Sequence, residues 1–295
     1  MMNTSATIVF FGTEDFSLTA LTGLIEAGYT IGAVVTKPDS KKGRGQQLVS
    51  PQVKVLATKY NIPVLQPRTL DEIIPDIKAL GAPTGVLVSY GKIIPQSIID
   101  LFTPGIINLH PSLLPKYRGP SPIESAIKNG DAVTGVTIMQ LSAKMDAGPI
   151  YAAKEHALFG TETRPELYHA LADVGTNLLL ENLPAIIDGT LKAEPQDESA
   201  TSYCQLLQKS DAHLDLTSMS AQQAERIIRA HIGFPKSKLT LLNQVVIVTK
   251  AHTAPQPKTP LDSVCRDGAY LCIDELTAPS GRHMDADAFL RGYAA

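Results

Sequence analysis

Short apolar segments rich in valine and isoleucine recur along the first half of the chain. They are apolar at successive positions, a pattern typical of strands buried on both faces of a sheet. Helical patterns lie between several of them. This alternation predicts βαβ units and a doubly wound, mostly parallel sheet with a Rossmann-like α/β fold. The predicted strands are 8–11, 32–36, 85–89, 105–110 and 134–141, and the predicted helices are 15–27, 51–60 and 70–80.

Two further features concern helix limits. Ser50 precedes Pro51, which is typical of a helix N-cap followed by proline at the first helical position. A longer helical pattern over 164–187 carries leucines on one face, and Gly189 follows it as a C-terminal signal. We expect this long helix to pack on the sheet.

The chain changes in kind after this helix. A polar segment over 191–206, which contains Pro195, has no periodicity and is predicted to be a linker. We therefore expect a large N-terminal domain over 1–190 and a small C-terminal domain over 207–295. Short strand patterns separated by loops favour an OB-like β-barrel for the second domain. Its predicted elements are a helix over 221–230 and strands over 239–242, 245–248 and 270–273.

Composition narrows the class of protein. Of the 295 residues 44% are apolar, and no apolar run approaches the roughly 18 residues that cross a bilayer. The N-terminus lacks the basic start of a secretory signal, so we expect a cytoplasmic protein. The net charge of -3 means that any nucleic-acid contact must come from a local basic patch. Three cysteines without CxxC spacing favour neither disulfides nor a zinc site.

The turn after the first predicted strand does not favour a dinucleotide cofactor. A dinucleotide-binding loop needs several glycines for close approach to a pyrophosphate, and here only Gly12 is present. Glu14 and Asp15 would also repel phosphate from the start of the following helix.

The segment N-L-H-P-S-L-L-P-K-Y-R-G begins at the end of the 105–110 strand. Asn108 and His110 are two residues apart in it, so their side chains point to one face. The carboxyl end of a parallel strand is where ligands bind in open α/β sheets. These residues are candidates for catalysis, although an Asn and a His that merely hydrogen bond within a turn would give the same pattern.

A third polar residue follows a neighbouring strand. Asp146 lies in the glycine-containing loop M-D-A-G-P-I after the 134–141 strand, from where its carboxylate can reach His110. An amide and an imidazolium can both donate hydrogen bonds to an oxyanion, and a carboxylate can take a proton through a water molecule. The set Asn108, His110 and Asp146 therefore suits acyl transfer to an amine, and we expect no metal.

The N-L-H-P-S-L-L-P-K-Y-R-G-P-S-P-I segment and the downstream D-A-G-P-I resemble the formyltetrahydrofolate-dependent formyltransferases. The resemblance implies 10-formyltetrahydrofolate as formyl donor and catalytic roles for Asn108, His110 and Asp146. It also implies a folate site. The folate-binding residues implied are Ser112, Leu113, Leu114 and Pro115, with the backbone of Ser89, Tyr90 and Gly91 lining the pterin pocket.

Within this family the chain resembles the branch that formylates methionine on initiator tRNA for translation initiation. The loop T-K-P-D-S-K-K-G-R-G over 36–45 and the pattern Y-C-Q-L-L-Q-K-S-D-A-H-L-D-L over 203–216 carry that resemblance. It implies tRNA contacts by Lys41, Lys42 and Arg44, and we expect a monomer. The basic loop can equally be a solvated turn. Lys116 and Arg118 are contacts to folate glutamate or phosphate, or surface charges.

Two other functions share parts of this pattern. A formyltransferase that acts on a small amine, such as an amino sugar or a nucleotide, would use the same donor and catalytic residues. A nonenzymatic RNA-binding module would keep the same segments with catalytically idle side chains. The C-terminal domain distinguishes the first alternative, and substitution of the three candidate residues distinguishes the second.

Overall fold

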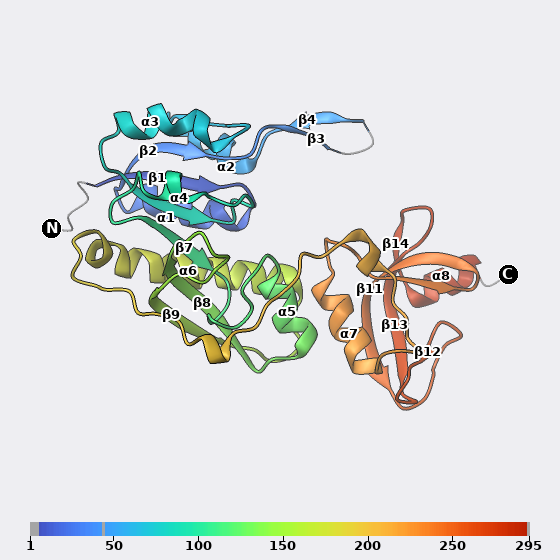
Figure 1. Cartoon of the computed structure of the whole chain (residues 1–295). Coiled ribbons are helices and arrows are strands. Elements are labelled where there is room, and N and C mark those ends of the chain that lie inside the picture. Colours follow the sequence, from blue (N-terminus) through green and yellow to red (C-terminus); the bar gives the residue numbers. More distant parts are fainter. Residues whose placement is uncertain (1–5, 43–44, 294–295) are drawn as a thin grey trace. The chain divides into compact units, whose positions relative to one another are not determined.

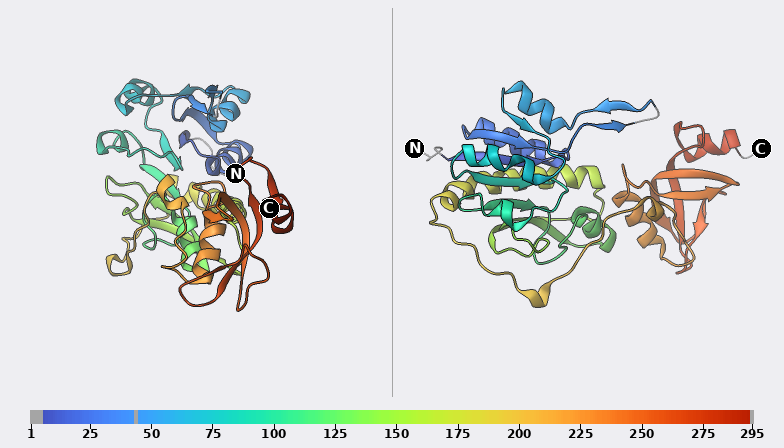
Figure 2. Two further views of the ribbon diagram at one scale, coloured as in Figure 1. Left: turned by 90° about the vertical axis from the view of Figure 1, so that its right-hand side faces the viewer. Right: turned by 45° about the horizontal axis from the view of Figure 1, so that its top comes forward.

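The computed structural model describes residues 6–42 and 45–293. The chain forms two compact units, each assembled from separate segments (Figures 1 and 2). The first unit comprises 1–120, 134–156 and 168–203, and the second comprises 121–133, 157–167 and 204–295. The division into 1–190, a linker over 191–206 and 207–295 stays a prediction.

The first unit is built on a seven-stranded sheet. Its strands are β1 (Thr7–Gly12), β2 (Thr30–Val35), β5 (Val64–Leu65), β6 (Thr84–Val88), β7 (Ile106–His110), β8 (Val133–Gln140) and β9 (Ile150–Ala157). They lie in the order β5-β2-β1-β6-β7-β8-β9. The strands from β5 to β7 are parallel, whereas β8 runs antiparallel to β7. The predicted mostly parallel sheet is confirmed.

Helices cover both faces of this sheet. Val9 and Phe11 of β1 belong to an apolar cluster with the helices on one face. Phe10 lies on the opposite face, beside the first helix. A Cβ added at Gly12 would collide with both Phe10 and Ser17 of that helix, so the two side chains lie close together. The doubly wound arrangement follows. On the first face lie η1 (Leu70–Ile73), α3 (Ile74–Ala79) and α4 (Gln96–Ile99), and on the second lie α1 (Phe16–Glu26), α2 (Gln52–Lys59) and α6 (Arg164–Ile187).

The long helix α6 has the limits predicted from its leucine pattern, and it packs on the strand that carries the candidate residues. Leu171 and Leu179 of this helix are fully buried. Gly175 faces Leu109 of β7 so closely that a Cβ there would collide with the leucine side chain. Glycine at this position therefore lets the helix pack closely on β7.

The basic loop after β2 contains a hairpin that the sequence pattern did not predict. Its strands are β3 (Ser40–Lys42) and β4 (Gln47–Val49). Asp39 at its base accepts hydrogen bonds from Gln66 Nε2 at 2.8 Å, Lys54 Nζ at 2.8 Å and Ser50 Oγ at 2.9 Å. The bonds from Gln66 and Lys54 lower the pKa of Asp39 to about 2.

The helix start predicted at Ser50 is wrong by one residue. The N-cap of α2 is Pro51, which has an extended ψ of 137°, and the helix begins at Gln52. The Ser50 hydroxyl donates to Asp39 and makes no cap. The cause is tertiary, since the partner that competes for the serine lies eleven residues earlier in the chain.

The second unit is a curled antiparallel sheet, a half-barrel, with helices against it. Helix α7 begins in a capping box, in which Ser220 and Gln223 each bond the backbone N–H of the other. Its buried face, including Ile228, packs with the sheet in one apolar cluster. The strands are β10 (Lys238–Leu241), β11 (Gln244–Ala254), β12 (Ser263–Val264), β13 (Tyr270–Thr277) and β14 (His283–Asp285), and the helices are α5 (Pro122–Asn129), α7 (Ala221–Ala230) and α8 (Ala286–Tyr293).

Two more short 3₁₀ helices, η2 (Glu198–Ala200) and η3 (Lys209–Ala212), complete the elements. Over residues 6–42 and 45–293, none of the helices combines the length and the apolar character that a membrane span requires.

His231, at the C-terminal end of α7, is a buried histidine in the second unit. It is 2% exposed, and its Nε2 has no hydrogen-bond partner among the described residues. Burial, helped by the charge of Lys128, lowers the pKa of His231 to about 4. The unfolded chain therefore binds the proton more readily than the folded protein, and the second unit is more stable above pH 6.5 than below it.

We predict that lowering the pH from 7 to 5 costs the second unit about 2 kcal/mol through His231. In His231→Leu this loss should disappear, because leucine carries no proton at any pH. Urea unfolding of both proteins at the two pH values measures the difference. His283→Gln is the control, because the His283 side chain is 55% exposed. Equal pH sensitivity in His231→Leu and the parent would contradict the prediction.

Candidate active site

Asn108 and His110 lie at the carboxyl end of β7, with 5% exposure each. Strand alternation directs both side chains to one face, and β7 lies between β6 and β8. Within the described part of the chain the Asn108 side chain has no hydrogen-bonding partner. The amide atoms of Asn108 are not fully enclosed, so they remain open to a ligand at the surface of the site.

The imidazole of His110 is held by the loop that follows it. Its Nε2 lies 3.0 Å from the carbonyl oxygen of Tyr117. A carbonyl can only accept, so Nε2 carries a hydrogen and donates it. Tyr117 adopts a left-handed conformation, with φ of 59°, which turns this carbonyl toward the ring. The other ring nitrogen, Nδ1, therefore faces the rest of the site.

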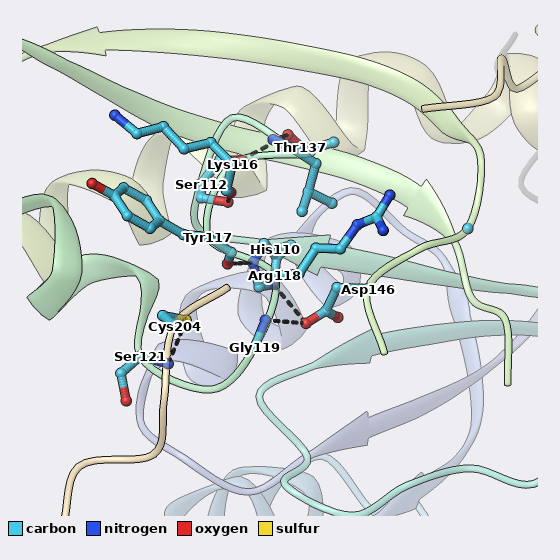
Figure 3. Close-up of polar contacts among 12 residues, drawn as sticks. His110, Ser112, Lys116, Tyr117, Arg118, Gly119, Ser121, Thr137, Asp146 and Cys204 are labelled. Carbon is cyan, nitrogen blue, oxygen red and sulfur yellow. Dashed lines mark hydrogen bonds and ion pairs between the residues drawn. The ribbon is translucent and has the colours of Figure 1, made fainter. Parts of the chain in front are cut away.

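Asp146 lies opposite that nitrogen. Its Oδ2 is 3.8 Å from His110 Nδ1 and accepts a hydrogen bond of 2.8 Å from the backbone N–H of Gly119 (Figure 3). Asp146 itself has a left-handed φ of 46°. Gly148 is required nearby, because a Cβ there would overlap the Gln140 carbonyl oxygen. The structure thus brings His110 and Asp146 together from strands and loops separated in sequence.

The S-L-L-P segment forms a loop whose shape is set by one threonine of β8. Thr137 Oγ1 donates to the Ser112 carbonyl at 2.7 Å and accepts from the Leu114 N–H at 3.0 Å. The Ser112 hydroxyl is also used inside the loop, where it donates to the Lys116 carbonyl at 2.6 Å. Leu113 packs over Gly135 of β8, Leu114 is buried, and Pro115 is half-buried. Ser112 is fully buried, and its hydroxyl, carbonyl and N–H are all bonded within the protein, so it shapes the loop from inside.

The segment Ser89, Tyr90 and Gly91 follows β6, next to the end of β7. Ser89 and Gly91 both have left-handed φ, and the Ser89 carbonyl accepts from the backbone N–H of Thr13. The Tyr90 side chain is fully buried against Phe11, and burial raises the pKa of its hydroxyl to about 12. The Tyr90 side chain is therefore part of the core, and the Tyr90 carbonyl accepts from Thr13 Oγ1 at 3.1 Å.

Two of the candidate tRNA contacts, Lys41 and Lys42, lie on β3. Lys41 is exposed on β3, and Lys42 is the last residue of that strand. Arg44 lies outside the described residues. Leu48 of β4, 69% exposed, gives the hairpin an apolar surface as well as a basic one.

Lys116 and Arg118 differ, although they were open to the same interpretations. Lys116 is exposed, with its ammonium 4.8 Å from the centre of the Tyr117 ring. Arg118 is 1% exposed and bonds to Gln196 and Glu198, so it is neither a surface charge nor an open phosphate contact.

Sequence reasoning missed several residues that shape the site, namely Tyr117, Gly119, Thr137 and Gln196. Tyr117 and Gly119 act through backbone atoms, which carry no residue-specific signal. Thr137 looked like one more residue of a buried strand, and Gln196 lay in a segment interpreted as a linker. Among the residues that the structure describes, no three His, Cys, Asp or Glu side chains form a metal-binding group.

Residues 6–183 match the formyl transferase family. Over 97% of its length the chain is 36% identical to methionyl-tRNA formyltransferase of Geobacter metallireducens, and it covers 95% of that protein. It is 38% identical to the Janthinobacterium methionyl-tRNA formyltransferase, with 97% of both chains covered. The chain belongs to the methionyl-tRNA formyltransferase family. The formyltransferase resemblance drawn from the N-L-H-P-S-L-L-P segment is confirmed.

Solved structures share the fold of this formyltransferase at lower identity. WlaRD, a sugar 3N-formyl transferase, superimposes with a TM-score of 0.68 at 19% identity, covering 91% of this chain and 97% of its own. HypX from Aquifex aeolicus, solved with tetrahydrofolic acid, gives a TM-score of 0.65 at 17% identity. That match covers 98% of this chain but 47% of HypX, so the chain spans about half of the HypX length. These likenesses concern the fold alone.

We predict that Thr137→Val loosens the S-L-L-P loop. Valine keeps the shape but leaves the Ser112 carbonyl and the Leu114 N–H without a partner, at a cost of roughly 1–3 kcal/mol in the free energy of unfolding. Thr176→Val is a matched control, because the buried Thr176 Oγ1 has no partner to lose. That control should be neutral or stabilising. Urea unfolding of both variants measures the contrast, and equal effects would contradict the role given to Thr137.

Proposed function

We propose that this protein transfers the formyl group of 10-formyltetrahydrofolate to the amino group of methionyl initiator tRNA, giving the formylated tRNA used in translation initiation. The observation that carries the proposal is the His110 and Asp146 pair, 3.8 Å apart beside the unpartnered amide of Asn108. This arrangement suits acyl transfer to an amine. The family membership over the full chain supports the same reaction.

Asn108 and His110 would stabilise the negative charge that develops on the formyl oxygen when the amine attacks. Asn108 offers an amide N–H that none of the described residues uses. His110 donates through Nδ1–H, since its Nε2–H is committed to Tyr117. It therefore acts as the imidazolium, with both nitrogens protonated. Fixed donors of this kind lower the barrier because they need no reorganisation during the reaction.

Asp146 would handle the proton that the attacking amine must lose. The amine forms a new bond to the formyl carbon, and the bond from that carbon to N10 of the folate breaks. Asp146 takes the amine proton through a water molecule, and the proton passes to N10 as tetrahydrofolate leaves. The bond from Gly119 N–H to Oδ2 keeps the carboxylate directed at the site.

The folate would lie along the carboxyl edge of the sheet. The loop of Ser112, Leu113, Leu114 and Pro115 gives it a rigid wall, because Thr137 and Lys116 satisfy the loop's internal hydrogen bonds. Backbone groups of Ser89, Tyr90 and Gly91 would contact the pterin. The acceptor tRNA would be held by Lys41, Lys42 and Arg44 and by the half-barrel of the second unit. A cytoplasmic location and a monomeric state belong to the same proposal.

We predict that Asn108→Ala lowers kcat for formyl transfer by roughly 100- to 1000-fold, the usual effect of losing one oxyanion donor. The free energy of unfolding should change by no more than about 1 kcal/mol, because Asn108 has no protein partner to lose. Asp146→Asn should also lose turnover, because an amide accepts from Gly119 but takes no proton. The measurement is transfer of labelled formyl from 10-formyltetrahydrofolate to methionyl initiator tRNA.

The same assay separates the alternatives. An amino sugar or nucleotide that outcompetes charged tRNA as acceptor would replace the tRNA assignment and leave the formyl transfer intact. Variants with unchanged activity toward every acceptor would remove the catalytic assignment altogether.

We further predict that tRNA binding weakens steeply with salt, and that Lys41→Gln makes the slope of log K against log salt shallower by about 1. Filter binding or fluorescence titration at several salt concentrations measures it. Lys78→Gln on α3 is a control of the same charge change at another exposed position. A parent slope near zero, or equal slopes for Lys41→Gln and the parent, would remove the hairpin from the tRNA site.

A further inference from the structure

Arg118 is a buried arginine whose partners are far from it in sequence. Its Nε and Nη2 donate to Gln196 Oε1 at 3.0 and 2.7 Å. Its Nη1 and Nη2 donate to the two oxygens of Glu198 at 3.1 and 2.9 Å. Gln196 and Glu198 belong to the segment that the sequence presents as a polar linker. A guanidinium at 1% exposure is retained only where its donors are satisfied in this way.

The other end of the Gln196 side chain contacts the loop that carries Asp146. Its Nε2 donates to the Asp146 carbonyl at 2.9 Å and to the Gly148 carbonyl at 2.7 Å. The orientation of the amide is determined, because an oxygen must face the guanidinium and an NH₂ must face the two carbonyls. Gln196 therefore donates both of its amide hydrogens to this one loop.

Gly119, the residue after Arg118, contacts the same aspartate as Gln196. Gly119 N–H donates to the Asp146 side chain, whereas Gln196 holds the Asp146 backbone. Tyr117, the residue before Arg118, holds His110 through its carbonyl. Residues 117–119 thus fix, in succession, the imidazole, the Gln196 amide and the carboxylate of the site.

The neighbouring residues of this segment attach it firmly to the same loop. Ser202 N–H donates to the Pro115 carbonyl, its carbonyl accepts from Arg118 N–H, and its hydroxyl accepts from Tyr117 N–H. The segment over 196–203 therefore lies along residues 115–118 within the first unit. It is part of the wall of the site rather than a free connection.

We propose that Gln196, oriented by Arg118, is a positioning residue that sets the distance between the Asp146 carboxylate and His110. The backbone conformation of Asp146 shows why such a residue is needed. Asp146 has a φ of 46°, a left-handed conformation that is uncommon for residues other than glycine and that contacts with its surroundings help to maintain. The two bonds from Gln196 hold the carbonyls on either side of Ala147 and so maintain that conformation.

The proposal rests on the catalytic role proposed for Asp146, and the test separates the two. Gln196→Glu keeps an oxygen toward Arg118 but cannot donate to the two carbonyls. Gln196→Met removes the donors without adding charge. Glu198→Gln is the matched control. Glu198 is the other partner of Arg118, its own side chain is 71% exposed, and its substitution leaves the Asp146 loop untouched.

We expect both Gln196 variants to lower kcat by roughly 10- to 100-fold, the effect of a small misplacement of a reacting group. KM for charged tRNA and for the folate should stay close to the parent values. The acid limb of the pH profile of kcat should shift, since Asp146 and His110 no longer face each other at the same distance. Amide hydrogen exchange over 144–148 should become faster. Glu198→Gln should resemble the parent in all four measurements.

Several results would overturn the proposal. One is a parent-like kcat in both Gln196 variants, and another is an equal loss in Glu198→Gln. A loss of kcat with an unshifted pH profile, or failure of both Gln196 variants to fold, would make the segment a general support of the fold instead. If the parent itself does not formylate charged initiator tRNA, the proposed function fails, whereas activity in the parent with no effect at Gln196 removes only the positioning role.

Discussion

The bond from His110 Nε2 to the Tyr117 carbonyl is the constraint on which the site depends. It decides which ring nitrogen is available, because a nitrogen that donates to a carbonyl cannot also serve a ligand. Nδ1 is left to face Asp146, and any donation by His110 to a substrate requires the doubly protonated ring. The tautomer is thus set by the backbone of a loop seven residues away, and the chemistry proposed for the site follows from it.

Three loops of the site contain a residue in an unfavourable backbone conformation. Ser89, Tyr117 and Asp146 are all non-glycine residues with left-handed φ, and each belongs to a different loop. Such conformations are unfavourable by roughly 1–3 kcal/mol each and persist where the surroundings impose them. Here the surroundings are hydrogen bonds. Thr13 N–H donates to the Ser89 carbonyl, Gln196 Nε2 donates to the Asp146 carbonyl, and the Ser202 hydroxyl accepts from Tyr117 N–H. These conformations lower the free energy of unfolding, but two of them direct the Tyr117 carbonyl and the Asp146 carboxylate toward His110.

The sequence was enough to predict the order of layers and the meeting of His110 with Asp146. Continuous apolar segments identified β1, β2, β6, β7 and β8, and the leucine pattern gave both limits of α6. It was not enough for features made by contacts between distant residues. Ser50 was expected to cap a helix, but Asp39 competes for its hydroxyl. Gln196 gave no signal, because one polar residue in a polar segment looks the same whether its amide meets water or Arg118. The roles of the individual residues stay predictions.

The attachment of residues 196–203 to the first unit bears on how the protein can be divided. A fragment that ends near residue 190 would omit Gln196 and Ser202, and with them the bonds that restrain Asp146 and Tyr117. Low turnover by such a fragment would not show that the half-barrel selects the acceptor, since the Asp146 carboxylate would also have lost its restraints. Chimaeras that exchange only the C-terminal segment 204–295 between relatives are better joined after Tyr203, so that each catalytic unit keeps its own Gln196 and Ser202 contacts.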